Sequence, residues 1–187
     1  GIGYCWLYAG SENRITGRTG KMRRLIWPVL FLFLMLLQGS MSVYYTGWLS
    51  CDLLLLAVYA YAMLRGEKAG AVAGGIIGLL QDAMTVGVFG FHIFSRICVG
   101  YIVGLTKEKV FKDNYLYHMS AIATITFILR FVYWWLELLR TGGRWSIFFA
   151  YLWDSLGYII GNALLVWPVV VIMKMIYEWI RKEDISY

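Results

Sequence analysis

The stretch GGIIGLLQDAMTVGVFGFH, residues 74–92, is apolar and rich in glycine, yet it contains a carboxylate at Asp82. A charged side chain inside an apolar membrane helix is costly, so where one occurs it marks a contact inside a helix bundle. The stretch therefore predicts a closely packed helix in which Asp82 faces other polar groups.

The composition of the whole chain favours lipid as its solvent. Of the 187 residues, 60% are hydrophobic and 15% are charged, whereas soluble domains have about 45–50% apolar and about 25% charged residues. At ~20 residues per span plus short loops, the chain has room for about six membrane helices and none for a separate soluble domain. The net charge of +6 comes from basic residues between apolar runs, where they set topology, so nucleic acid is not a predicted partner.

Apolar runs mark six expected spans. They cover about 25–38 (at its longest 25–45), 48–64, 69–88, 91–105, 116–139 and 156–175. The last apolar stretch, 145–179, would be ~52 Å long as a single helix, which exceeds the bilayer core. We therefore expect residues 145–153 to form an interfacial segment before the last span, and the alternative is one kinked span. Pro168 is expected to kink the span.

The basic residues predict that both termini are cytoplasmic. With six spans and an inner N-terminus, thirteen of the 17 lysines and arginines lie on the inner side. Only Arg140 and Arg144 lie on the outer side, while Arg96 and Arg130 lie within spans. The positive-inside rule selects this orientation. The predicted fold is an all-α polytopic membrane protein with a bundle of about six transmembrane helices.

The two ends of the chain are expected to lie outside this bundle. Residues 1–21 contain no sustained apolar run, and Met22 opens MRRLIWP, which resembles a natural start. We therefore expect residues 1–21 to be an N-terminal extension, either sequence upstream of a true start at Met22 or a poorly ordered part of the protein. Residues 22–180 are expected to form the six-helix membrane domain, and residues 181–187 a short cytoplasmic tail.

The charged residues within the spans are expected at one depth. At 1.5 Å per residue, Asp82 lies roughly 21 Å from the inner side, or about 9 Å from the outer face of a ~30 Å core. Arg96, on the returning helix, lies about 9 Å from the same face. The same reasoning brings further charged residues to this level, and His92 shares a helix face with Arg96 at i,i+4. The intramembrane polar layer consists of Asp52, Asp82, His92, Arg96, Arg130 and Asp154.

This polar layer has two main interpretations. It is either a satisfied network that fixes helix register, in which Asp82 pairs with Arg96 or Arg130, or an outward-facing cavity for a solute or a partner's helix. Proton relay or catalysis is a third. The sequence contains no HExxH, P-loop, GxSxG or dinucleotide fingerprint, so no catalytic residue, metal site or cofactor is predicted.

Small residues repeat at four-residue spacing on two of the expected spans. They are Gly70, Gly74 and Gly78 on the third span, and Gly157 and Gly161 on the last. Such spacing places small residues on one helix face and lets another helix approach closely. The partner helix is expected within this chain, and the alternative is a helix of another protein.

Several short motifs in residues 51–104 follow one another in a recognisable order. An aspartate opens an aliphatic span, a glycine-rich helix ends in G-x-L-x-D, two glycines follow, and the next helix ends in V-G-Y-x-x-G. Here these features are Asp52, residues 74–78 with Leu80 and Asp82, Gly87 and Gly90, and residues 99–104. This order resembles MreD, the membrane component of the bacterial rod-shape (elongation) complex, and the start MRRLIWP is also typical. Cys51 departs from the family, which usually has proline there.

The resemblance implies a non-enzymatic scaffold in the bacterial cytoplasmic (inner) membrane. MreD proteins associate with MreC, the actin-like MreB filament, the glycosyltransferase RodA and a class B penicillin-binding protein, which together insert side-wall peptidoglycan. The family is also similar to the substrate-binding S components of energy-coupling-factor vitamin transporters, which implies an S-component-like bundle. A vitamin-binding S component is thus the alternative function, although residues 25–38 lack the Ala-x-x-x-Ala face typical of those subunits.

Overall fold

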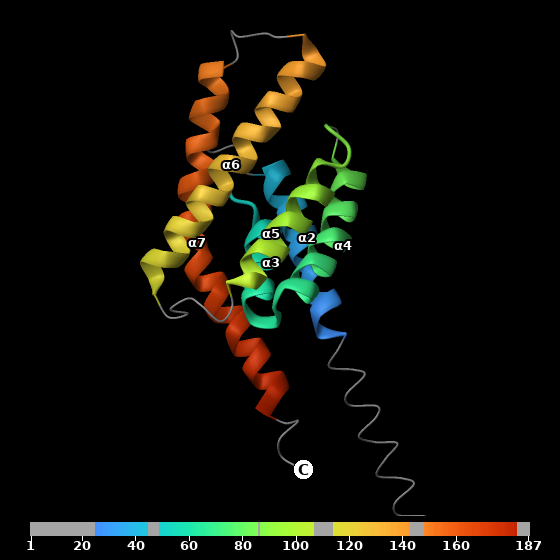
Figure 1. Cartoon of the computed structure of the whole chain (residues 1–187), viewed down its shortest axis with the longest axis vertical. Coiled ribbons are helices and arrows are strands. Elements are labelled where there is room, and N and C mark those ends of the chain that lie inside the picture. The colour runs from blue at the N-terminus through green and yellow to red at the C-terminus, as the bar shows by residue number, and fades with distance from the viewer. Residues whose placement is uncertain (1–24, 45–48, 86, 107–113, 143–147, 183–187) are drawn as a thin grey trace, which may run out of the picture.

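The computed structural model describes residues 25–44, 49–85, 87–106, 114–142 and 148–182, and in these residues the chain forms six helices and no strand. The helices are labelled in Figure 1. In chain order they are α2 (Ile26–Tyr44), α3 (Leu53–Arg65), α4 (Glu67–Met84), α5 (Phe91–Leu105), α6 (Tyr115–Thr141) and α7 (Phe148–Lys182). The all-α prediction is therefore confirmed for the described part of the chain.

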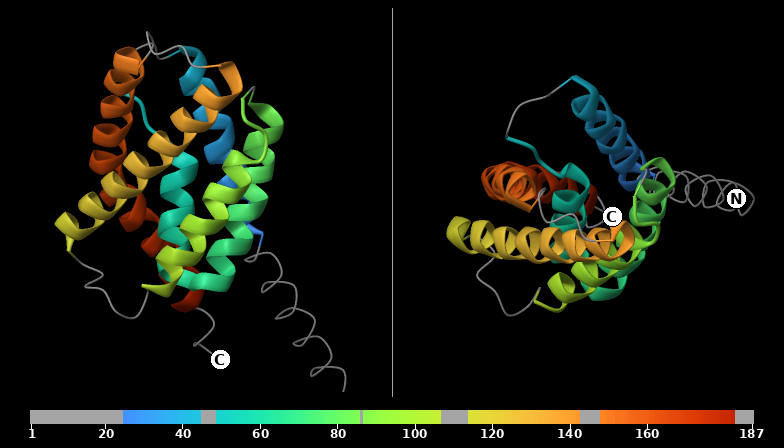
Figure 2. Two further views of the ribbon diagram at one scale, coloured as in Figure 1. Left: turned by 45° about the horizontal axis from the view of Figure 1, so that its top comes forward. Right: turned by 90° about the horizontal axis from the view of Figure 1, so that it is seen from above.

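Helix α3 lies at the centre of the bundle. Its sequence LLLLAVYAYAMLR is apolar on every side, and nearly all of its residues from Leu53 to Met63 are buried. A helix that is hydrophobic all round belongs inside a protein, and α3 packs against α2, α4, α5 and α7 (Figure 2). Leu56 of α3 shares one core cluster with Ile122 of α6 and Val166 of α7. The polar groups at the start of α3 are consequently held among several helices.

Helices α4 and α5 form an antiparallel pair whose backbones touch. A Cβ atom added at Gly74 would lie 2.2 Å from the carbonyl oxygen of Arg96. At Gly70 it would lie 2.5 Å from the carbonyl oxygen of Gly100, and at Gly78 2.5 Å from that of His92. Real Cβ atoms do not come so close to backbone oxygen. The glycine face of α4 therefore packs on α5, within the same chain.

The glycines of α7 have different surroundings. A Cβ atom at Gly161 would lie 2.1 Å from the carbonyl oxygen of Ser50, in the segment that leads into α3. Gly157 is buried one turn earlier on α7. Gly161 therefore allows α7 to approach a non-helical segment, and the approach brings α7 close to the residue that begins α3.

Helix α7 is a single helix from Phe148 to Lys182 with Pro168 inside it. Residues 148–153 continue directly into the helix, which agrees with the alternative of one kinked helix and not with an interfacial segment set apart from the span. Residues 145–147 lie outside the described residues. A helix longer than the bilayer core can tilt or extend beyond it, so length alone does not require a break. The orange and red parts of α7 run in different directions in Figure 1, as expected for a helix with an internal proline.

Two helices in the described residues are long and apolar enough to cross a membrane, Tyr115–Arg140 and Phe148–Arg181. Three shorter apolar helices are Ile26–Met41, Leu53–Arg65 and Phe91–Leu105. The six-span arrangement with both termini inside stays a prediction. The division of the chain into residues 1–21, 22–180 and 181–187 also stays a prediction. Residues 1–21 lie outside the described residues.

Candidate functional site

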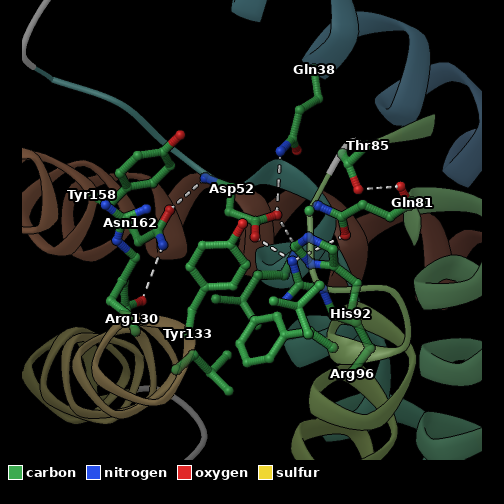
Figure 3. A pocket seen from close by; sticks show the side chains of 16 residues that line it. Gln38, Asp52, Gln81, Thr85, His92, Arg96, Arg130, Tyr133, Tyr158 and Asn162 are labelled. Atoms are coloured by element: carbon green, nitrogen blue, oxygen red, sulfur yellow. Dashed lines mark hydrogen bonds and ion pairs between the residues drawn. The ribbon is translucent and has the colours of Figure 1, made fainter. Parts of the chain in front are cut away.

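A polar cavity of about 330 Å³ lies among the helices that surround the start of α3. Four of the six residues in the predicted polar layer line it, and these are Asp52, His92, Arg96 and Arg130. Figure 3 shows Asp52 between the side chains of α7 on one side and those of α4 and α5 on the other. The cavity therefore collects residues that lie far apart in the sequence.

The central contact of this cavity is an ion pair between Asp52 and Arg96. The side chain of Arg96 is 2% exposed and that of Asp52 is 16% exposed. Asp52 also caps α3 by accepting a hydrogen bond from the backbone nitrogen of Leu55 at 2.9 Å, and Arg96 donates to Gln81 Oε1 at 3.1 Å. Buried charges require such partners because they have lost their water. The pair thus ties the first turn of α3 to α4 and α5.

Two amide side chains complete the surroundings of Asp52. Asn162 of α7 accepts a hydrogen bond from the backbone nitrogen of Asp52 at 2.8 Å and donates one to Thr126 Oγ1 of α6 at 3.0 Å. Gln38 of α2 accepts from the backbone nitrogen of Leu54 at 3.1 Å, and its Nε2 lies 3.5 Å from Asp52 Oδ1. Through these contacts the start of α3 is joined to α2, α6 and α7 as well.

Sequence reasoning missed these uncharged members of the site. They are Gln38, Gln81, Thr126, Tyr158 and Asn162, all of which line the cavity. A signal was present, because Gln81 directly precedes Asp82 and Asn162 directly follows Gly161, each within an apolar run. A buried amide also needs hydrogen-bond partners, so it marks a polar site in the same way as a charge does.

Asp82 has a different role from the one expected. Its Oδ2 accepts hydrogen bonds from the backbone nitrogens of Gly90 and Ile93, both at 3.0 Å, and its Oδ1 accepts one from that of His92 at 3.2 Å. The first N–H groups of a helix lack partners within the helix, and a carboxylate there also suits the helix dipole. The expected pairing of Asp82 with Arg96 or Arg130 is therefore wrong, since this 4%-exposed carboxylate caps α5 instead.

Arg130 binds groups of α7. Its Nη2 lies 2.5 Å from Asp154 Oδ2, and its Nε donates to Ser155 Oγ at 3.1 Å. Its guanidinium carbon lies 4.4 Å and 4.5 Å from the ring centroids of Tyr151 and Tyr158, within cation–π range. Asp154 is 52% exposed and does not line the cavity. This pair therefore joins α6 to α7 beside the cavity, separately from the Asp52–Arg96 pair.

Two buried nitrogen atoms of cavity-lining residues have no hydrogen-bond partner among the described residues, His92 Nδ1 and Arg96 Nε. The Nε of arginine is always a donor, and the Nδ1 of histidine donates or accepts according to the tautomer. A buried donor without an acceptor is costly. Both atoms are themselves buried, so the packing around the cavity leaves this cost in the folded protein.

We expect Asp82→Ala to lower the free energy of unfolding by about 2–4 kcal/mol, because three partly buried backbone N–H groups lose a charged acceptor. Asp82→Asn should cost less, since one oxygen still accepts. Neither variant should be rescued by Arg96→Gln, because Asp82 does not neutralise that arginine. The measurement is thermal unfolding of the purified protein followed by size-exclusion chromatography. If Arg96→Gln did recover the stability lost in the Asp82 variants, Asp82 and Arg96 would have to form an ion pair after all.

Comparison with known proteins adds one finding. A family model described as rod shape-determining protein MreD matches residues 19–176. The match contains the cavity, the α4–α5 pair and most of α7. Searches of the curated proteins and of the solved structures each gave no match. Among the described residues, no group of three or more histidine, cysteine, aspartate or glutamate side chains is placed to hold a metal ion.

Proposed function

Because the chain belongs to the MreD family of rod shape-determining proteins, we propose that it is a non-enzymatic, multi-pass membrane scaffold of the bacterial elongation complex. In this role it links MreC and MreB to RodA and a class B penicillin-binding protein, which build side-wall peptidoglycan. The observation that supports the proposal beyond family membership is the polar cavity, which is lined by charged and amide side chains. Such a cavity offers a partner an anchoring point.

The apolar outer surface of the helix bundle supports its placement in a lipid bilayer. Large apolar side chains are exposed on most of the helices, among them Leu36 at 60%, Phe94 at 73%, Phe131 at 54% and Leu164 at 50%. An apolar surface this extensive is unusual for a protein in water, where it marks interaction sites, and it is the expected surface of a helix bundle in a bilayer. We therefore take all six helices as spans.

The proposed orientation can be tested with reporter fusions. A periplasmic reporter such as alkaline phosphatase should be active when fused after Gly142, at the end of α6, and inactive when fused after Lys182, at the end of α7. The reason is that the positive-inside rule keeps the basic end of α7 in the cytoplasm. Equal activity at both positions, or the reverse pattern, would exclude the orientation.

The scaffold role itself predicts a cellular phenotype. Depletion of the protein should convert rods to spheres, and the protein should co-purify with MreC from detergent-solubilised membranes. Mass spectrometry of the co-purified proteins identifies the partners. Normal rods after deletion, together with tight binding of a vitamin by the purified protein, would overturn the proposal in favour of a transporter subunit.

The cavity can be blocked without removing any of its polar groups. Val88 lines the cavity, whereas its neighbour Phe89 is 73% exposed and does not. Val88→Trp should reduce recovery of MreC on the order of tenfold or more, as expected for loss of a central interface contact, while Phe89→Trp should not. Both variants should elute as the parent does in size-exclusion chromatography. If the Val88→Trp variant folds and still binds MreC, MreC does not bind at the polar cavity.

A further inference from the structure

A second hollow, lined almost entirely by apolar side chains, lies between α2, α3 and α4. Its volume is about 790 Å³. The buried residues Leu54 and Ile77 form its floor, and the exposed side chains of Leu32, Val72 and Ile76 lie along its sides. We call this hollow the α2–α4 groove. Because its sides are exposed, the groove is open to whatever surrounds the protein.

The charged residues of the groove lie at one end. Arg65 and Lys68 are the two that line it, and they flank the turn between α3 and α4. Both are exposed, and the ion pairs found among the described residues involve other arginines. At the same end the rings of Trp27 and Tyr61 meet edge to face, with centroids 4.8 Å apart. Cations next to tryptophan and tyrosine are typical of the interface between lipid and water.

The length of the groove matches one leaflet. Its lining residues on α4 run from Lys68 to Leu80, which corresponds to ~18 Å at 1.5 Å per residue. Half of a ~30 Å hydrocarbon core is ~15 Å. In the proposed orientation the basic end lies on the cytoplasmic side, so the rest of the groove follows the acyl region of the inner leaflet.

We propose that the α2–α4 groove binds an anionic phospholipid of the inner leaflet. The phosphate lies at Arg65 and Lys68, and one acyl chain lies along α4 over Val72 and Ile76. Basic pockets between transmembrane helices on the cytoplasmic side are known to suit such headgroups. An apolar helix of a partner protein would fill the groove but leave both cations without a counter-charge, which favours the lipid. The inference rests on the proposed membrane placement and is independent of the scaffold role.

Binding can be measured on the full chain in detergent by native mass spectrometry with added phosphatidylglycerol or phosphatidylcholine. The protein should retain phosphatidylglycerol and release phosphatidylcholine. Replacing both cations (Arg65→Gln with Lys68→Gln) should weaken retention on the order of tenfold, given the contribution of each basic residue near a membrane surface. The matched control replaces two exposed cations on α7 (Lys174→Gln with Arg181→Gln). It removes the same charge outside the groove and should change nothing.

A second variant tests the acyl site. Ala73 lines the groove, and Leu79 is exposed on the same helix but does not line it. With phosphatidylglycerol that carries a photoreactive acyl chain, Ala73→Phe should abolish cross-linking to α4, and Leu79→Phe should leave it intact. Both variants should elute as the parent does.

Three results would overturn the proposal. They are equal retention of the two lipids, unchanged binding after loss of both groove cations, and loss of a partner protein from Ala73→Phe while lipid binding persists. The last would assign the groove to a partner's helix. Failure of the membrane placement would be distinguishable, because the chain would then remain in solution without detergent.

Discussion

Asp52→Asn is expected to lower the free energy of unfolding by about 3–5 kcal/mol, the usual cost of leaving one member of a buried ion pair uncompensated. The side chain of Arg96 is 2% exposed, so it cannot regain water when its partner becomes neutral. Asparagine is a good helix N-cap, so the bond to the backbone nitrogen of Leu55 is expected to survive. The substitution therefore isolates the loss of charge. Denaturant or thermal unfolding in detergent measures it.

The double variant Asp52→Asn with Arg96→Gln sharpens this test. If the loss comes from an uncompensated charge, removing the second charge should recover most of the stability, and the two single effects should not add. The exposed pair Arg140–Glu137 supplies a control, since Glu137→Gln should leave unfolding almost unchanged. If the double variant loses as much free energy of unfolding as the two single variants together, the broken ion pair does not cause the loss.

Gly74→Ala is expected to lower the free energy of unfolding by about 1–3 kcal/mol or more through overpacking. The added Cβ atom would lie 2.2 Å from the carbonyl oxygen of Arg96, and a backbone atom cannot rotate away. Helices α4 and α5 would have to separate, and the guanidinium of Arg96 would shift relative to Asp52. The readout is the yield of monodisperse protein and its unfolding temperature.

Gly75→Ala is the matched control because it adds the same atom one residue further along α4. There the nearest neighbour is the flexible side chain of Ile97 at 3.3 Å. Alanine also favours helix over glycine by about 1 kcal/mol, so this variant should be as stable as the parent or slightly more stable. Equal behaviour of the Gly74 and Gly75 variants would contradict the close packing of α4 on α5.

The sequence alone predicts the helical class, the family and several members of the site. The apolar runs correspond to the six described helices because hydrophobicity and chain length determine where helices form in such a chain. The number of residues from the end of each expected span predicts one depth in the membrane for Asp52, Arg96 and Arg130. The structure places all three along a single cavity.

The partner of each charge could not be predicted in this way. Depth gives the height of a residue along a helix, but not the direction in which its side chain points or which helix is its neighbour. Asp82 and Arg96 share a level on consecutive helices, yet Asp82 faces the free N–H groups at the start of α5. Arg96 instead reaches Asp52, 44 residues away in the sequence, which only the three-dimensional packing around α3 brings near.

Arg96 takes part in two of the contacts described above, and this has a mechanical consequence. Its carbonyl group touches α4 at Gly74, while its guanidinium group holds the start of α3. Arg96 therefore couples the spacing between α4 and α5 to the position of the first turn of α3, so that a change at one contact is transmitted to the other.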